Sequence, residues 1–288
     1  PGVEFDWAVS PAVSLRAGYA ETSRVPTEAE LSCADEDAPC SLANFFIADP
    51  PLEQVVARTF ELGASGRHRG DGWEIDWLAS AYRATNVNDI QFVASDIRGR
   101  GYFENIGRTR RQGVEASLTA RRGGLRLGAS YAFIDATFRL PVTLSSPANP
   151  EADDDGEINV AKGDRLTGIP RHSAALTADY EGRLGRRAFS IGGDMIARSG
   201  QWLVGDEANR NPQVPGYTVF NLRGRIEMVR GVWLFAEVRN LSGREFATFG
   251  TFSEVDEVDL VEVPGASDPR AYGPGAPRRV TAGITARF

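Results

Sequence analysis

Two cysteines and two histidines carry the strongest metal-binding or nucleophilic chemistry in this 288-residue sequence. Cys33 and Cys40 lie close together in the acidic segment SCADEDAPCS, whose composition predicts a loop. A structural zinc site needs four thiolate or imidazole ligands, and neither His68 nor His172 is near the cysteines in the sequence. The pair therefore predicts a disulfide, which forms in an oxidising compartment. The alternative is two free thiols in a reducing one.

Acidic segments offer a second kind of chemistry, calcium binding. The segment EADDDGE (151–157) begins like an EF-hand loop, with carboxylates at alternating positions before a glycine. The twelfth position is Lys162, where a bidentate glutamate is required, so we interpret 151–157 and 253–259 as solvated acidic loops. The sequence contains no nucleophile elbow and no phosphate loop. We expect no catalytic, cofactor or metal site and no enzymatic activity.

Composition and charge restrict the class of protein. The residues are 42% hydrophobic and 25% charged, which is typical of a folded chain. A net charge of −7 argues against a nucleic-acid partner. No apolar run approaches the ~20 residues that a membrane helix needs. The chain opens with Pro-Gly and then a strand-like run, without a signal peptide, so we expect a piece of a longer protein.

Apolar and polar residues alternate in eleven segments, which predicts eleven β-strands. The first ten segments are 3–10, 13–20, 58–66, 73–81, 113–121, 125–133, 173–180, 188–197, 218–226 and 232–241. The apolar parity of the last consists of Val280, Ala282, Ile284, Ala286 and Phe288. Alternation is imperfect only in 232–241, where Trp233 and Phe235 share the parity of the charged residues.

The connections alternate between very short and very long, and the long ones cover roughly 22–54, 88–108, 138–170, 200–215 and 250–277. Because antiparallel strands reverse direction, the short turns gather at one end of the sheet and the long loops at the other. Outer-membrane barrels have this asymmetry. Aromatic residues near both strand ends and lengths close to the 9–11 residues that cross a bilayer favour an outward apolar face. The alternative is a soluble all-β binding module with its apolar face inside.

An odd number of strands bears on whether this barrel closes by itself. Single-chain bacterial barrels have even strand numbers, so eleven strands predict an incomplete wall. If the short turns are periplasmic, the first and last strands both run inward and the C-terminus is periplasmic. The sequence thus predicts an all-β fold, an antiparallel transmembrane β-barrel of which about eleven strands are present. These would be half of a 22-stranded barrel, a size class whose lumen holds a plug.

Six segments resemble, in chain order, the C-terminal half of the barrel of TonB-dependent outer-membrane receptors. They are ETSRVPTEAELS (21–32), ENIGRTRRQGVEASL (104–118), GIPRHSAAL (168–176), VPGYTVFNLRGR (214–225), VRNLSGREFATFG (238–250) and APRRVTAGITARF (276–288). In the first segment Ser23 stands where the family commonly has an aromatic residue. The resemblance implies that residues 1–288 are the C-terminal portion of the barrel, without the N-terminal plug and the first half of the wall.

This resemblance also implies a function. Such receptors import a scarce small-molecule or metal-complex ligand, most often a ferric siderophore, across the outer membrane of Gram-negative bacteria, and they have no cofactor. TonB would supply energy through the plug domain that this chain lacks. Outer-membrane lipid, lipopolysaccharide and the barrel-assembly machinery are the other implied partners. The alternative function is a passive porin-like channel.

Individual residues in the loops and at the C-terminus are candidates for ligand contact or assembly. The aromatic loop residues are Phe45, Phe46, Tyr102, Phe103 and Trp202. They would face the ligand or, alternatively, pack the long loops on themselves. In the family that the chain resembles, a terminal aromatic residue such as Phe288 is the signal that the assembly machinery reads. The alternative for Phe288 is a core residue on the edge strand of a soluble sheet.

Overall fold

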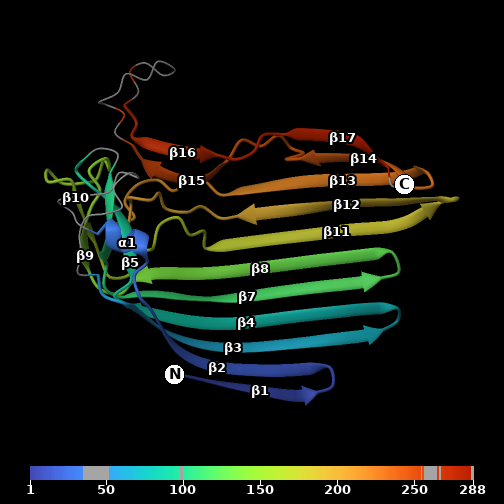
Figure 1. Cartoon of the computed structure of the whole chain (residues 1–288), viewed down its shortest axis with the longest axis horizontal. Coiled ribbons are helices and arrows are strands. Elements are labelled where there is room, and N and C mark those ends of the chain that lie inside the picture. The colour runs from blue at the N-terminus through green and yellow to red at the C-terminus, as the bar shows by residue number, and fades with distance from the viewer. Residues whose placement is uncertain (35–51, 98–99, 254, 256–264, 266, 287–288) are drawn as a thin grey trace.

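The computed structural model describes residues 1–34, 52–97, 100–253, 255, 265 and 267–286, and its main element is one antiparallel sheet of eleven strands (Figure 1). In spatial order the strands are β1 (Gly2–Ser10), β2 (Val13–Arg24), β3 (Val55–Gly70), β4 (Trp73–Val87), β7 (Thr109–Arg122), β8 (Leu125–Phe138), β11 (His172–Leu184), β12 (Arg187–Arg198), β13 (Tyr217–Val229), β14 (Val232–Arg239) and β17 (Arg279–Ala286). Each predicted segment lies in one of these strands over its described residues, except that 240 and 241 follow the end of β14. The predicted all-β fold is confirmed, and β1 and β17 are the two edges of the curved wall.

Five two-residue turns join the strands in pairs at one end of the wall (Figure 1). The commonest two-residue hairpin turns have at least one residue with positive φ, which glycine adopts without strain. Asp71 and Gly72 supply it between β3 and β4, with φ of 53° and 78°. Gly123, Gly185 and Gly231 supply it in three of the other turns. The predicted short connections are thus confirmed.

The long connections all lie at the opposite end of the wall (Figure 1). Three of them fold into hairpins, and one contains a helix that the sequence analysis did not predict. These elements are α1 (Glu28–Ser32), β5 (Ile90–Ala94), β6 (Gly101–Asn105), β9 (Val142–Ser145), β10 (Glu157–Val160), β15 (Ala247–Phe252) and β16 (Arg270–Pro274). A capping box starts α1: the Thr27 side chain accepts from the Glu30 N–H, and the Glu30 carboxylate accepts from the Thr27 N–H. In the described part of the chain, no helix is long and apolar enough to cross a membrane.

The last long loop begins earlier than predicted. We expected 250–277, whereas β14 ends at Arg239 and the connection runs from 240 to 278. Asn240 ends the strand because its backbone has a φ of 48° and its side-chain amide donates to the carbonyls of Arg244 and Ala276. Residues 247–252 therefore form the loop strand β15 instead of part of the wall.

The apolar side chains, at alternate positions of the wall strands, are exposed and do not pack in a core. Phe5 is 63% exposed, Leu62 65% and Ile284 72%. The largest cluster of buried apolar side chains lies in the loops and not between two layers of wall. A soluble sheet would bury its apolar face in such a layer, so these strands have the pattern of a wall whose apolar face meets lipid.

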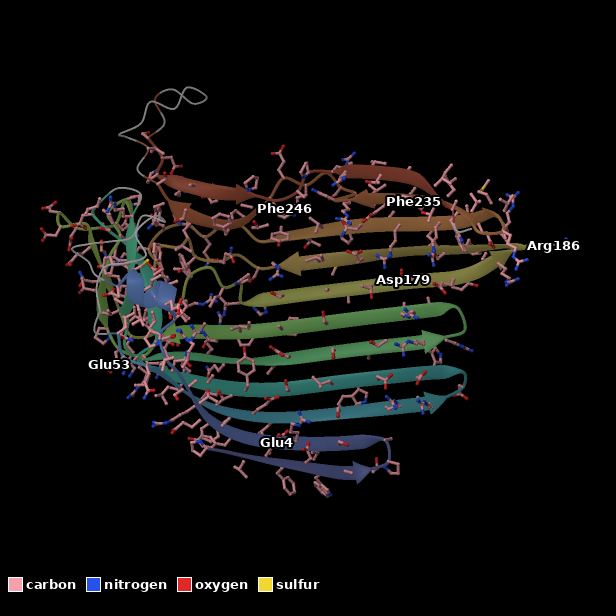
Figure 2. All side chains as sticks on the ribbon, in the orientation of Figure 1. Glu4, Glu53, Asp179, Arg186, Phe235 and Phe246 are labelled. Carbon is pink, nitrogen blue, oxygen red and sulfur yellow. The ribbon has the colours of Figure 1, made fainter. Side chains whose placement is uncertain are left out.

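The opposite face of the wall is charged and internally paired. Arg223 bridges two carboxylates, with Nη2 2.6 Å from Asp179 Oδ1 and Nη1 2.9 Å from Asp194 Oδ1 (Figure 2 labels Asp179). Arg16 similarly lies 2.9 Å from Glu4 and 3.1 Å from Asp6.

A charged side chain on the apolar face of the wall should prevent assembly, while the same side chain one residue further along the strand, on the charged face, should not. We expect Leu176→Arg in the full-length protein to destabilise the wall by about 2–4 kcal/mol, because the guanidinium would face hydrocarbon. Thr177→Arg is the matched control, since Thr177 pairs with Asp194 on the charged face. Heat-modifiable gel migration of outer-membrane fractions measures the folded amount. Equal folded amounts of the two variants would contradict the assigned faces.

Candidate functional site

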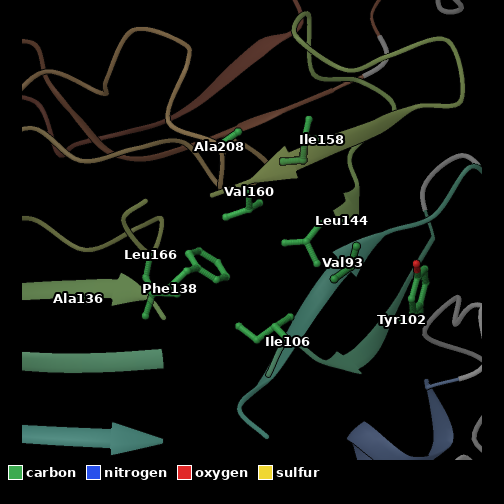
Figure 3. Close-up of a cluster of buried hydrophobic side chains, with 10 residues drawn as sticks. All are labelled: Val93, Tyr102, Ile106, Ala136, Phe138, Leu144, Ile158, Val160, Leu166 and Ala208. Carbon is green, nitrogen blue, oxygen red and sulfur yellow. The ribbon is translucent and has the colours of Figure 1, made fainter. Parts of the chain in front are cut away.

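The long loops join into one layer through a shared hydrophobic core. The side chains of this loop core are Val93, Tyr102, Ile106, Ala136, Phe138, Leu144, Ile158, Val160, Leu166 and Ala208 (Figure 3). Ala136 and Phe138 come from the upper end of β8, while the others come from the loops after β4, β8 and β12. Phe138 is fully buried. The wall thus extends directly into the core that orders the loops.

Asp206 organises the polar interior of this layer. It is fully buried, and its carboxylate accepts from the backbone N–H groups of Arg210 and Asn211, at 3.1 and 3.0 Å, and from the Asn211 side chain at 3.0 Å. Asn211 also donates to Asn149 Oδ1 at 2.9 Å, and Asn149 donates to the Gly205 carbonyl at 2.6 Å. Because these bonds are buried and charge-assisted, they fix the loop after β8 against the loop after β12.

Glu207 connects the same layer to the loop after β4. Its Oε1 accepts hydrogen bonds from Gln91 Nε2 at 2.9 Å, from Thr167 Oγ1 at 2.9 Å and from the Gly205 N–H at 3.2 Å. The residue is only 3% exposed. Burial raises the pKa of the Glu207 carboxyl, although the hydrogen bonds from Thr167 and Gly205 partly oppose the shift.

A cavity of about 270 Å³ opens beside Glu207 between four loop segments. It is lined by apolar, carboxylate, hydroxyl and guanidinium groups, so it can hold a ligand with both polar and apolar parts. The lining includes Phe92, Arg100, Ser146, Val204, Glu207 and Phe252. The hydrogen bonds of Asp206 and Glu207 hold this lining in place.

The predicted ligand-facing aromatics do not line this cavity in the described part of the chain. Tyr102 belongs to the loop core with 6% of its surface exposed, and Phe103 packs edge-on against Phe92 at 5.2 Å between ring centroids. Trp202 is half-buried in the loop after β12. These positions agree with the self-packing alternative for Tyr102 and Phe103. Phe45 and Phe46 lie outside the described residues, and a ligand role for any of the five stays a prediction.

Sequence reasoning missed the aromatics that line the cavity, Phe92 and Phe252. Both lie in loop hairpins, whose alternating pattern could have indicated short strands with one face toward other loops. Two further predicted positions, Cys40 and Phe288, lie outside the described residues. The Cys33–Cys40 disulfide and the assembly role of Phe288 therefore stay predictions.

Metal-binding side chains do not gather in the described ranges: no group of three or more His, Cys, Asp and Glu side chains there could hold an ion. The acidic segment 151–157 is instead a turn. Asp153 Oδ1 accepts from the N–H groups of Asp155 and Glu157, at 3.1 and 2.9 Å, and leads the chain into β10.

The sequence matches a known family over most of its length. The family described as TonB dependent receptor-like, beta-barrel, matches residues 1–241. This chain belongs to that family. Its membership confirms the resemblance that the six sequence segments carry.

Individual relatives agree with the family assignment. The metal-pseudopaline receptor CntO of Pseudomonas aeruginosa is 28% identical over 170 residues, which are 59% of this chain and 22% of that protein. Among solved structures, the copper transporter OprC has a TM-score of 0.66 at 17% identity, and the ferric yersiniabactin uptake receptor FyuA of Yersinia pestis has 0.67 at 13%. Both alignments cover 100% of this chain, but 39% and 37% of those chains. The chain therefore spans about a fifth of the curated relative and under two fifths of these structures.

The raised pKa of Glu207 predicts that the loop layer becomes more stable as the pH falls. In the folded state this carboxyl binds a proton at higher pH than in the unfolded chain, so stability is lost as the pH rises through the folded pKa. Another loop carboxyl, that of Asp268, has a pKa of about 2 beside Arg270. It therefore stays ionised above pH 5 and does not contribute to this pH dependence. We expect hydrogen exchange of loop amides, corrected for intrinsic rates, to slow as the pH is lowered from neutral toward the ordinary pKa of a glutamate.

The variant Glu207→Gln should remove most of this pH dependence, because the neutral amide keeps an acceptor oxygen for the same donors. Glu151→Gln, which changes an exposed carboxylate nearby, is the control and should retain it. Protection that does not change with pH in the unmodified protein would refute the role assigned to Glu207.

Proposed function

We propose that the full-length protein is an outer-membrane receptor that imports a ferric siderophore or another metal complex, with energy from TonB. The observation that carries the proposal is the family match over 1–241 on a wall whose apolar face is exposed. The relatives support the class of ligand, since their names specify a metal-pseudopaline complex, copper and ferric yersiniabactin. The chain itself acts as wall and loop layer, not as an enzyme.

Residues 1–288 form the C-terminal portion of the barrel in this proposal. The eleven strands are half of a 22-stranded wall, and the plug and the first strands belong to the part of the protein that precedes them. The exposed edges of β1 and β17 support this division, because strand edges inside a membrane must be paired. Both edges would pair with strands of the first half.

The short turns lie in the periplasm and the loop layer lies outside the cell in this orientation. Bacterial outer-membrane barrels have short periplasmic turns and longer external loops, which supports it. The strand β17 runs toward the short-turn end, where Ala286 pairs with Val232. The C-terminus is then periplasmic, where the barrel-assembly machinery would contact it.

The cavity beside Glu207 is the proposed point of ligand contact on this half of the receptor. The rings of Phe92 and Phe252 would pack against the apolar body of a metal complex, while Glu207, Arg100 and Ser146 would orient its polar groups. The hydrogen bonds of Asp206 and Glu207 reduce the freedom that these groups lose on binding, which favours affinity.

Binding and uptake by the full-length receptor test this function. We expect Phe92→Ala with Phe252→Ala to weaken binding of the transported complex about tenfold, which corresponds to ~1.4 kcal/mol. Phe246→Ala is the control, because Phe246 packs on Tyr217 at 4.4 Å and does not line the cavity. A panel of ferric hydroxamates, ferric catecholates and metal–pseudopaline complexes identifies the substrate by radiolabelled uptake. The proposal fails if uptake is equal in cells with and without TonB. Uptake that does not depend on TonB is the behaviour of a passive porin-like channel.

Deletion of Phe288 tests the proposed assembly signal separately from transport. We expect less folded receptor in the outer membrane, because aromatic side chains anchor strands at the membrane interface. Receptor that does assemble should keep near-normal ligand affinity, since the deletion lies at the other end of the wall from the loop layer. Unchanged assembly contradicts the signal role. Lost affinity in correctly folded barrels contradicts the orientation.

A further inference from the structure

Five arginines gather on the outward face of the wall just beyond its apolar region. Arg83 lies on β4, Arg110 on β7 and Arg139 directly after β8, while Arg165 and Arg171 precede β11. On the strands, Arg83 and Arg110 share the parity of exposed apolar residues such as Val114, so their side chains leave the wall on its lipid side. We call these five residues the outer arginine cluster.

Register brings the members of this cluster together. Thr137 pairs with Arg110 across the β7–β8 ladder and with Arg165 through an isolated bridge, and directly opposite residues share a face. The backbone N–H of Arg139 donates to the Arg108 carbonyl at 2.8 Å, which holds the start of the β8 loop beside β7. The guanidinium groups of Arg83 and Arg139 are close enough to repel that of Arg110.

Among the described residues, one carboxylate faces these five guanidinium groups. Asp135 lies 3.8 Å from Arg171 and accepts from Gln112 at 3.2 Å, and Gln112 in turn accepts from Arg83 at 3.1 Å. The cluster is thus strongly positive. Burial beside Arg171 also lowers the pKa of Arg165, so the site as it stands disfavours its own charges.

Unpaired polar atoms mark the centre of the cluster. Arg110 Nε, Thr137 Oγ1 and Arg165 Nε are buried and have no hydrogen-bond partner in the described structure. They belong to three consecutive residues of one cross-strand row. Buried donors of this kind are normally satisfied, so three adjacent orphans indicate a place for an external acceptor.

The position of the cluster along the strands, measured across the membrane, matches the headgroup layer. Tyr131, Phe133 and His172 form an aromatic group directly below it, with the Tyr131 hydroxyl 2.8 Å from His172 and Arg171 stacked 5.3 Å from the Phe133 ring. Aromatic side chains of this kind mark the membrane–water interface. Asp135 and Thr137 lie about 7 and 13 Å beyond Phe133 along the strand, at ~3.3 Å per residue. With the usual strand tilt these become ~5 and ~10 Å, which spans the polar layer outside the hydrocarbon.

We propose that the outer arginine cluster binds the phosphate monoesters of the glycolipid in the outer leaflet, the lipid A part of lipopolysaccharide. Several guanidinium groups can donate in pairs to the oxygens of one phosphate and relieve their mutual repulsion. The acyl chains of the same lipid would lie along the exposed apolar parity below Phe133. This site lies on the opposite face of the wall from its lumen. It rests on the proposed outer-membrane location, but not on the identity of the transported ligand.

The test measures lipid binding by the purified full-length receptor in phosphate-free detergent. The probes are bisphosphorylated lipid A, the same lipid with both phosphates removed, and inorganic phosphate. We expect the first to bind at least tenfold more tightly than the second, and inorganic phosphate not to compete at millimolar concentration. Each basic residue near an anionic lipid surface contributes a factor of about five. The double variant Arg110→Gln with Arg139→Gln should therefore weaken binding about 25-fold.

Two further variants keep the outcome decisive. Arg186→Gln with Arg187→Gln makes the same charge change at the short-turn end (Figure 2 labels Arg186) and should leave the affinity within twofold. Arg110→Lys with Arg139→Lys keeps the positive charge and should retain most of the lipid A binding. This variant can still be measured if the glutamine variant fails to assemble. Equal binding of the two lipids, equal loss in the short-turn control or competition by millimolar phosphate each overturns the proposal. Because ligand uptake is not measured, failure here is distinguishable from failure of the transport function.

Discussion

The backbone hydrogen bonds of the wall are the constraint on which the remaining structure depends. In hydrocarbon an unpaired N–H or C=O costs several kcal/mol, so each strand must be paired on both sides along its full crossing. The antiparallel ladders from β1 to β17 give every strand a neighbour on both sides, except the two edge strands. Pairing also fixes the side-chain period at two, which leaves one face of the wall for lipid and the other for charge.

The loop layer follows from the same wall. Long connections at one end bring eight apolar side chains together, and these side chains are buried against Ala136 and Phe138 from the end of β8. Burial of that core then permits a polar interior. Asp206 and Glu207 are tolerated there because backbone and side-chain donors surround their carboxylates. A rigid cavity beside Glu207 is the consequence, so the wall positions the candidate ligand groups indirectly.

Sequence periodicity predicted the wall well, because each face has one kind of surroundings along the whole strand. The strands, their order and the short turns are local consequences of alternation and of residues such as Gly72 and Gly231. Segment 232–241 shows the limit. Trp233 and Phe235 lie on the charged face because neighbours from other strands make room for them: Arg225 stacks 5.0 Å from the Trp233 ring, and Phe235 lies over Gly283. Alternation in one segment carries no information about such partners.

The candidate site depends on contacts of this second kind. Gln91, Thr167 and Glu207 are far apart in the sequence, and no local pattern brings them to one carboxylate oxygen. Tyr102 is an aromatic loop residue of the kind that often contacts ligands, but it lies in the loop core. Its position is decided by the neighbouring loops that pack against it. The outer arginine cluster has the same origin, because Arg165 reaches Thr137 only through the fold of the loop after β8. A barrel wall is therefore readable from its sequence, whereas its binding surfaces arise where loops or register bring distant residues together.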